Sequence, residues 1–457
     1  MLASCSTPPP PIDHDHGDHA DAGSLCFWSW APGHTLDAGS RATLMRSGCT
    51  RIYALRARLT VTDTGVRILP RGGAVAAGPA IADHAVFRVA SDCTPLLERG
   101  ATAALHDALL GAPGAHTAGI QLDWDVPTRL LPQYAAFLRE LHRALPQNCE
   151  LSCTALLCWL DAHGIEALAG AVDCLVPQFY HTGPPGDPLR CERLIAGEDL
   201  LGVLARCRAL GRPYRIGLPT FTQIALWGPD GVLLTANAQL RREEVLASAP
   251  TILRRAHETE DLLLVRTTRP LRADRLAVRV GSLALLARTR NAALATWLRT
   301  IRAHGGPHCR GAVCFRLPHP AQQATLSLAQ VAAAREDQAI APDIRAEAVR
   351  LATPGQWQLR FVNRGEADLL CTQAPLRFLA SADSGAVRSL LDPLASPLCP
   401  TPAHAGEPVS RRRADQLLLT LDHLSAGAAE HLEVLVTPAN ARLALHPLPS
   451  DPDPGAP

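Results

Sequence analysis

The sequence predicts an α/β protein in which a (β/α)₈ TIM barrel carries an insertion after its seventh strand and is followed by a β-sandwich-like domain. In the first region, short apolar runs alternate with segments of helical spacing, the pattern of parallel strands covered by helices. Several runs end in polar or aromatic residues, as barrel strands do where they form a site. After Pro342 the helical spacing disappears, and strand-like runs separated by Gly, Pro, Asn and Asp begin.

Eight strand candidates can be counted before residue 335, and helices are expected between them. The strands are expected at residues 26–30, 50–55, 84–90, 119–125, 151–156, 174–180, 215–221 and 311–317. The helices with the clearest spacing are expected at residues 96–110, 130–145 and 321–335. Eight strands in about 300 residues suit a barrel, whose usual size is roughly 250 residues with room for insertions.

The chain is therefore expected to divide into four parts. They are a tether at residues 1–23, the barrel at 24–335 with an insertion at 222–290, a β-rich accessory domain at 340–446, and a disordered Pro-rich tail at 447–457. The insertion is too long for a plain loop, and its apolar runs at residues 262–265 and 276–280 indicate strands. We expect it to overhang the C-terminal face of the barrel.

Composition excludes several classes of function. With 47% hydrophobic and 19% charged residues and a net charge of +1, the chain gives no reason to expect nucleic acid or an anionic membrane as partner. We find no window of the ~18 apolar residues that a membrane span needs. The fourteen cysteines form no C-x-x-C pair, so neither a zinc ribbon nor a redox motif is indicated, and we expect no cofactor and no metal. The oligomeric state is not indicated.

The first residues resemble the lipobox and tether of a bacterial lipoprotein. Leu2-Ala3-Ser4-Cys5 is followed by Ser-Thr and four prolines, so Cys5 would carry the lipid. The charged and apolar parts of a signal peptide are missing. We therefore expect that the signal begins upstream of Met1 and that the protein lies in the cell envelope; otherwise it is cytoplasmic. The His and Asp run at residues 13–21 fits a solvated linker better than a weak metal site.

An acidic row at the end of the fourth strand is the main candidate site. In Gly119-Ile-Gln-Leu-Asp-Trp-Asp125, residues two apart point to the same side of a strand, so Gln121, Asp123 and Asp125 form one polar row. Carboxylates paired in this way can share a proton-transfer task. The alternative interpretation is that the two aspartates only cap the loop and the start of the next helix.

Three further strands add side chains to the same end. The sixth strand contributes Gln178 and Tyr180, followed by His181, and the first contributes Trp28 and Trp30 at the same spacing. The eighth strand ends in Phe315, with Arg316 on the other side. Acids, a phenol, an amide and indoles at a barrel mouth suit a sugar ring, which needs a proton donor for its leaving oxygen and flat apolar faces for stacking. Core packing is the alternative for each tryptophan.

The motifs also resemble a known family. Gly119-Ile-Gln-Leu-Asp-Trp-Asp125 is similar to the strand-four signature D-G-x-D-x-D-x-E of glycoside hydrolase family 18, the chitinases and their relatives. Gln178-Phe-Tyr-His181 and Gly311-Ala-Val-Cys-Phe315 are similar to that family's M-x-Y-D and G-x-M-x-W. The same segments, with Trp159, resemble still more closely the bacterial domain of unknown function 3142, taken to be a barrel relative of those glycosidases. That family implies no established reaction.

Four positions differ from the chitinase pattern. Asp125 stands at the catalytic Glu, Gln121 and His181 at Asp, and Phe315 at Trp. Because a shift of about 1 Å can cost roughly 10²-fold in rate, the shorter acid implies a rebuilt site or a lost activity. The resemblance implies that Asp125 is the acid, that Asp123 holds the acetamido group of the sugar, which acts as nucleophile, and that Tyr180 hydrogen-bonds its oxygen.

Three functions stay open at this point. The first is a glycoside hydrolase that acts on a polysaccharide, with Asp125 as general acid and Gln121, Gln178, His181, Trp28, Trp30 and Phe315 binding substrate. The second is a noncatalytic carbohydrate-binding barrel that has lost its acid. The third is a structural envelope lipoprotein whose barrel is a scaffold for partners. Fold class alone does not distinguish them.

Overall fold

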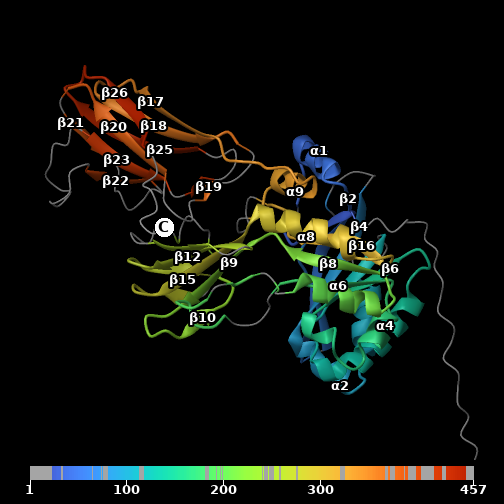
Figure 1. Ribbon diagram of the computed structural model, residues 1–457. Coiled ribbons are helices and arrows are strands. Elements are labelled where there is room, and N and C mark those ends of the chain that lie inside the picture. Colours follow the sequence, from blue (N-terminus) through green and yellow to red (C-terminus); the bar gives the residue numbers. More distant parts are fainter. Residues whose placement is uncertain are drawn as a thin grey trace, which may run out of the picture.

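Eight parallel strands close into a barrel in the computed structural model (Figure 1). Each strand is hydrogen-bonded to its neighbours, and β1 pairs with both β2 and β16, so the ring has no free edge. All eight predicted strands are confirmed. In chain order they are β1 (Leu25–Ser29), β2 (Cys49–Thr62), β4 (Ala82–Val89), β5 (Gly119–Asp123), β6 (Glu150–Ala155), β7 (Cys174–Pro177), β8 (Tyr214–Pro219) and β16 (Cys309–Phe315).

The structure describes most, but not all, of the chain. The described residues are 23–31, 34–63, 65–73, 75, 81–112, 118–180, 185–191, 193–195, 197, 199–238, 240, 245, 252–256, 259–273, 276–319, 325–365, 369–370, 376–384, 386–389, 398–402, 416–421, 423–424 and 429–448. Cys5 and His181, both predicted to be functional, lie outside them.

Helices surround the barrel between successive strands. They are α1 (Ala38–Arg46), α2 (Thr94–Glu98), α3 (Ala103–Leu110), α4 (Leu131–Ala144), α5 (Ile165–Ala169), α6 (Leu200–Ala209), α8 (Asn291–His304) and α9 (Leu328–Arg335), with 3₁₀ turns η1 (Ser91–Cys93), η2 (Thr128–Leu130) and η3 (Leu157–Trp159). The helix predicted at residues 96–110 is two helices, because Gly100 adopts a positive φ of 67° between them. No described helix is long and apolar enough to cross a membrane.

Strand pleating separates two sets of side chains in the barrel. On β5, Ile120 and Leu122 point outward into the core that the helices cover, whereas Gln121 and Asp123 lie on the other side. Trp124, just after the strand, joins the outer core and contacts Tyr134 of α4 at a ring separation of 5.5 Å. Outward packing therefore fixes which residues face the barrel interior.

The barrel interior is filled in layers. At the N-terminal ends of the strands, Arg51 forms an ion pair with Glu150, and the pair lies beside His84 and Arg215. Above them lies an apolar layer that includes Trp28, and the carbonyl ends of the strands carry the candidate site. Burial lowers the pKa of His84 to about 4, so this histidine is neutral near pH 7.

The insertion after β8 forms an antiparallel five-stranded sheet in the order β10-β9-β15-β12-β11. Its strands are β9 (Thr222–Trp227), β10 (Leu233–Thr235), β11 (Ile252–Ala256), β12 (Glu260–Arg266) and β15 (Leu283–Thr289), with a separate hairpin of β13 (Leu271–Ala273) and β14 (Leu276–Val278). Apolar side chains cover both faces of the sheet, and one face packs against Tyr180 and Phe315 of the barrel. The insertion therefore extends from the C-terminal face, as Figure 1 shows.

The C-terminal strands form a separate β-rich body with its own apolar core, which includes Phe361 and Phe378 at a ring separation of 4.9 Å. The strands are β17 (Ile344–Arg350), β18 (Gln356–Asn363), β19 (Leu369–Leu370), β20 (Leu376–Ala382), β21 (Ala386–Ser389), β22 (Leu398–Pro402), β23 (Gln416–Leu421), β24 (His423–Leu424), β25 (Ala429–Thr437) and β26 (Leu443–Leu448). Two four-stranded sheets, β17-β18-β25-β21 and β22-β23-β20-β26, make up most of it.

Three local features differ from the sequence prediction. The second strand was expected to end at residue 55, but β2 continues to Thr62 and pairs with an unpredicted antiparallel strand, β3 (Gly65–Pro70). The expected start of the tail at Pro447 falls inside β26, where Pro447 pairs with Phe378. Helix α9 begins at Leu328, seven residues later than the predicted helix, and residues 320–324 lie outside the described part.

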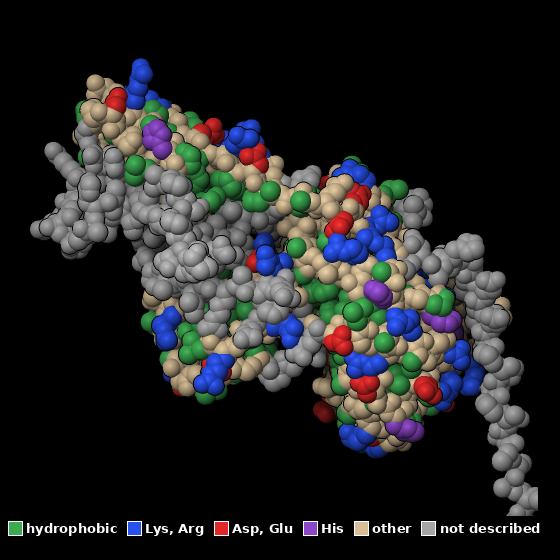
Figure 2. Space-filling view, viewed as in Figure 1, with side chains coloured by type: hydrophobic (Ala, Val, Ile, Leu, Met, Phe, Trp, Pro, Cys, Tyr) green, Lys and Arg blue, Asp and Glu red, His purple; other side chains and the backbone are tan. Residues whose placement is uncertain are grey.

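The cysteines with described side chains are free thiols. Cys153 is fully buried and Cys149 nearly so, whereas Cys158 is exposed. Figure 2 shows positive and negative side chains interspersed over the visible face of the barrel, in keeping with the net charge of +1.

Substitution of Gly311 tests how closely β16 approaches the start of β1, where the barrel closes. Its φ is +91°, and a Cβ there would lie 2.0 Å from the Ser24 carbonyl oxygen, just before β1. Gly231 has a similar φ of +79° but open space around it. Gly231→Ala should therefore lower the free energy of unfolding by about 1–2 kcal/mol, from backbone strain alone. Gly311→Ala should cost roughly 1–3 kcal/mol more, because the backbone must move. Urea unfolding measures both; equal losses would contradict a close approach of β16 to the start of β1.

Candidate functional site

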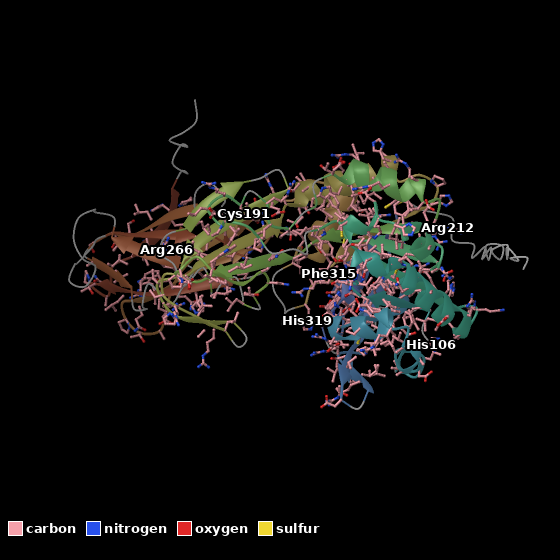
Figure 3. The ribbon with its side chains drawn as sticks, turned by 90° about the horizontal axis from the view of Figure 1, so that it is seen from below. His106, Cys191, Arg212, Arg266, Phe315 and His319 are labelled. Atoms are coloured by element: carbon pink, nitrogen blue, oxygen red, sulfur yellow. The ribbon has the colours of Figure 1, made fainter. Side chains whose placement is uncertain are left out.

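The candidate site lies at the C-terminal end of the barrel. Asp123 ends β5, Asp125 follows it, and Tyr180 lies three residues beyond the end of β7. Phe315 ends β16. Figure 3 places Phe315 and His319 on the side of the barrel on which Cys191 and Arg266 lie, and Arg212 and His106 on the far side. The mouth of the barrel thus faces the insertion.

Arg88 of β4 joins the two aspartates. One guanidinium nitrogen lies 2.7 Å from Asp123 Oδ1, and the other lies 2.5 Å from Asp125 Oδ2. Arg88 is on the same side of β4 as Val86, which lies in the barrel interior, and it pairs in register with Asp123 on β5. Strand register therefore brings a cation between two carboxylates that would otherwise repel each other.

The two aspartates differ in exposure. The Asp123 side chain is 3% exposed, whereas that of Asp125 is 36% exposed, so only Asp125 is open to an approaching molecule. Thr154 of β6 donates a hydrogen bond to Asp123 Oδ1 at 2.9 Å. Burial raises the pKa of Asp123 and the neighbouring Asp125 adds to this, while Arg88 and Thr154 oppose it.

Aromatic rings gather around Phe315. Its ring centroid lies 5.5 Å from that of Trp30 and 5.9 Å from that of Tyr180, whose plane is only 21° away from parallel. Phe221 and Trp28 contact it edge to face at 5.4 Å and 5.9 Å. Trp30, Tyr180 and Phe315 are each partly exposed. The mouth therefore presents aromatic surface of the kind that stacks on a sugar ring.

Tyr180 shares its surroundings with both acids. Burial of its hydroxyl raises the pKa of Tyr180 well above its ordinary value, and the nearby negative charges of Asp123 and Asp125 raise it further. A phenol in this environment keeps its proton near neutral pH and can donate it in a hydrogen bond. This electrostatic influence supports the expectation that the three side chains lie in one site.

Other expected ligand-binding residues lie deeper. Trp28 is 2% exposed and donates its indole N–H to Gln121 Oε1 at 2.5 Å, and the Gln121 amide donates to Ser152 at 3.2 Å. Gln178 is also buried. Because Trp28, Gln121 and Gln178 are buried, the structure does not support direct ligand contact by these three side chains. The hydrogen bonds of Trp28 and Gln121 instead connect β1, β5 and β6 inside the barrel.

Several residues at this end were not predicted from the sequence. Arg88 and Thr154 contact the acids directly. His34 and His319 follow β1 and β16, and their rings meet edge to face at 4.7 Å. The sequence feature that could have indicated Arg88 is its position as a lone arginine in the apolar run of the third strand, two residues after Val86. Among the described residues, no group of three or more His, Cys, Asp or Glu is placed to hold a metal ion.

Comparison with known proteins supports the expected family. Residues 101–320 match the family model DUF3142, a domain of unknown function. Among solved structures, the chain is similar to the spore cortex-lytic enzyme SleL of Bacillus cereus, at 13% identity over 69% of this chain and 74% of that chain, with a TM-score of 0.42. No curated protein matches the chain significantly.

Two solved chitinase structures are similar to this chain to about the same degree. Chitinase ChiW from Paenibacillus sp. str. FPU-7 matches at 11% identity and a TM-score of 0.44, over 93% of this chain and 56% of that chain, so this chain spans about half of ChiW. A chitinase from Bacteroides thetaiotaomicron matches at 13% identity and a TM-score of 0.41, over 68% and 96% of the two chains.

Arg88→Met tests the electrostatics of the site. With its pKa raised, Asp123 binds a proton more tightly in the folded protein than in the unfolded chain, so the stability due to the protonated form is lost as pH rises through the folded-state pKa. Removing Arg88 raises that pKa further. We expect the variant to lose roughly 1–3 kcal/mol near neutral pH and less in acid.

Urea unfolding from about pH 4 to about pH 8 measures this difference. In an Asp123→Asn background the buried titrating group is gone and only the more exposed Asp125 is left to pair with Arg88, so the cost of Arg88→Met should there depend less on pH. If the loss of unfolding free energy in Arg88→Met is the same at every pH, or becomes smaller as pH rises, the assigned ion pair of Arg88 with Asp123 is contradicted.

Proposed function

We propose that this chain, whose residues 101–320 match the family model DUF3142, binds a polysaccharide at the C-terminal mouth of its barrel and cleaves glycosidic bonds there with Asp125 as general acid. One observation carries the proposal. A partly exposed carboxylate lies beside a buried one, with a partly exposed aromatic surface at the same barrel end. A sugar stacked on Phe315 or Trp30 would bring its glycosidic oxygen toward the acids.

The environments of the aspartates divide their roles. Asp125 is exposed enough to reach a leaving oxygen, so it is the proton donor. Asp123 is held by Arg88 and Thr154 and therefore positions the site. In the substrate-assisted reaction that the family resemblance implies, the acetamido group attacks the anomeric carbon and the protein supplies only one acid. The Tyr180 hydroxyl would then donate a hydrogen bond to the acetamido oxygen.

The ion pair of Arg88 with Asp125 sets a condition on this chemistry. A general acid must present its carboxyl group to the leaving oxygen, and the Arg88 contact at 2.5 Å occupies one oxygen of Asp125. Catalysis therefore requires the contact to be released when the substrate binds, leaving Arg88 with Asp123. Rotation of the exposed Asp125 side chain would do this without any change in the barrel.

The same ion pair favours a second function. If Arg88 stays in contact with Asp125 when a ligand is bound, the barrel binds a glycan and does not cleave it. A glycan array with the purified chain identifies ligands for either function. Incubation of each hit with the protein, followed by product analysis, separates them, because only a hydrolase produces shorter sugars.

Asp125→Asn tests the proposed acid. The amide keeps the shape of the side chain but cannot protonate a leaving oxygen, so turnover of an array hit should fall by about 10²- to 10⁴-fold with ligand affinity retained. Tyr180→Phe should reduce turnover less. Asp107→Asn, at an exposed carboxylate on α3, is the matched control and should change neither quantity. Undiminished hydrolysis by Asp125→Asn would remove Asp125 as the acid.

We also propose that a lipid on Cys5 anchors the protein in the cell envelope, with the described domains beyond the proline tether. Membrane fractionation of cells that express the full gene tests this. The wild type should be found with the membranes, and Cys5→Ser should be released. Equal distribution of the two proteins would exclude the anchor.

A further inference from the structure

Arg316 is the residue next to Phe315 at the barrel mouth, and its guanidinium lies over the Phe315 ring. The guanidinium carbon is 5.8 Å from the ring centroid, within the range of a cation–π contact. The side chain is only partly exposed, and its Nε is buried without a hydrogen-bond acceptor. The cation is thus held on the aromatic surface on which we expect a sugar to stack.

No carboxylate pairs with Arg316 among the residues that the structure describes. Burial lowers the pKa of Arg316 to about 10, and no neighbouring negative charge offsets this effect. A buried or half-buried cation without a partner costs free energy that a bound anion would recover. Within the described part of the mouth, the charge of Arg316 therefore has no carboxylate to neutralise it.

The other arginines inside the barrel differ in this respect. Arg88 is occupied by Asp123 and Asp125, and Arg51 forms an ion pair with Glu150. Arg215 is buried and donates a hydrogen bond to the carbonyl of Arg310. Each thus has an acceptor within the protein. Arg316 is set apart by its place beside Phe315 at the mouth, where its side chain is partly exposed.

We propose that the glycan bound at this mouth carries a carboxylate, and that Arg316 binds that carboxylate while the sugar ring contacts Phe315 and its aromatic neighbours. The proposal rests on the proposed polysaccharide-binding function and names the class of ligand. The planar guanidinium presents paired N–H donors that match the two oxygens of a carboxylate, and the ring beneath it restricts its orientation. A neutral sugar would leave that charge unpaired.

Three oligosaccharides of similar length distinguish the ligand classes. The first is tetra-N-acetylchitotetraose, which has acetamido groups and no charge. The second is a peptide-free tetrasaccharide of alternating N-acetylglucosamine and N-acetylmuramic acid, which differs from the first by its carboxylate-bearing ether groups. The third is tetragalacturonate, which has carboxylates and no acetamido group. Calorimetry measures the affinity of the full chain for each.

We expect the wild type to bind at least one carboxylated probe more tightly than chitotetraose, and less so as salt is raised. Arg316→Gln should weaken binding of that probe by roughly 10- to 100-fold and leave binding of chitotetraose unchanged. Arg316→Lys keeps the positive charge but lacks the paired N–H donors of the guanidinium. Its affinity for the carboxylated probe should lie between those of the wild type and Arg316→Gln. Arg212→Gln, at an exposed arginine on the far side of the barrel, is the control and should have no effect.

The outcomes separate this inference from the proposed function. A wild type that binds or cleaves chitotetraose without preferring either carboxylated probe overturns the role of Arg316 and leaves the glycosidase proposal standing. The role of Arg316 is also overturned if Arg316→Gln weakens the binding of all probes equally, because the residue then has only a structural effect. The glycosidase proposal again stands. Arg316-dependent binding without any cleavage keeps the inference and rejects hydrolysis. Binding of none of the probes rejects the inference.

Discussion

The pleat of the barrel strands, locked in a closed ring by the pairing of β1 with β16, determines which side chains meet at the centre of this protein. On β5 it directs Ile120 and Leu122 into the core under the helices and Asp123 toward the interior. A slip of one residue in register would exchange these two sets and bury apolar surface on the wrong side. The free energy of packing against α4 therefore holds the acidic row in place, although no residue of α4 belongs to the site.

Within that ring, the acids at the mouth are held at an electrostatic cost. Asp123 is removed from water and lies beside a second carboxylate, and both effects favour its protonated form. Arg88 and Thr154 offset part of this cost. The result is an asymmetric pair in which the buried acid is tied to the scaffold on two sides and the exposed acid by a single contact.

The sequence alone predicts the barrel, its eight strands and the inward rows, because these follow from residue periodicity within single strands. It does not predict Arg88 as the partner of Asp123, because that contact depends on the register between β4 and β5. Nor does it predict that Trp28 and Gln121 are buried, since alternation gives the side of a strand but not the depth in the barrel. The β2–β3 extension was missed because arginines interrupt the apolar run after Leu55. His181 and Cys5 stay predictions, since both lie outside the described residues.

The insertion holds the aromatic surface of the barrel mouth in place. Glu260 at the start of β12 is fully buried and accepts the backbone N–H groups of Leu194 and Ile195 at 2.8 and 2.9 Å. This ties the segment after β7 to the insertion, and the apolar cluster that it completes packs against Tyr180 and Phe315. The rings of the mouth are therefore packed against a second sheet, so they would lose little conformational freedom if the proposed ligand bound. If the mouth binds a glycan as proposed, selectivity among sugars would depend on polar groups such as Asp125, which is partly exposed and contacts Arg88, and Arg316, whose guanidinium lies over the Phe315 ring.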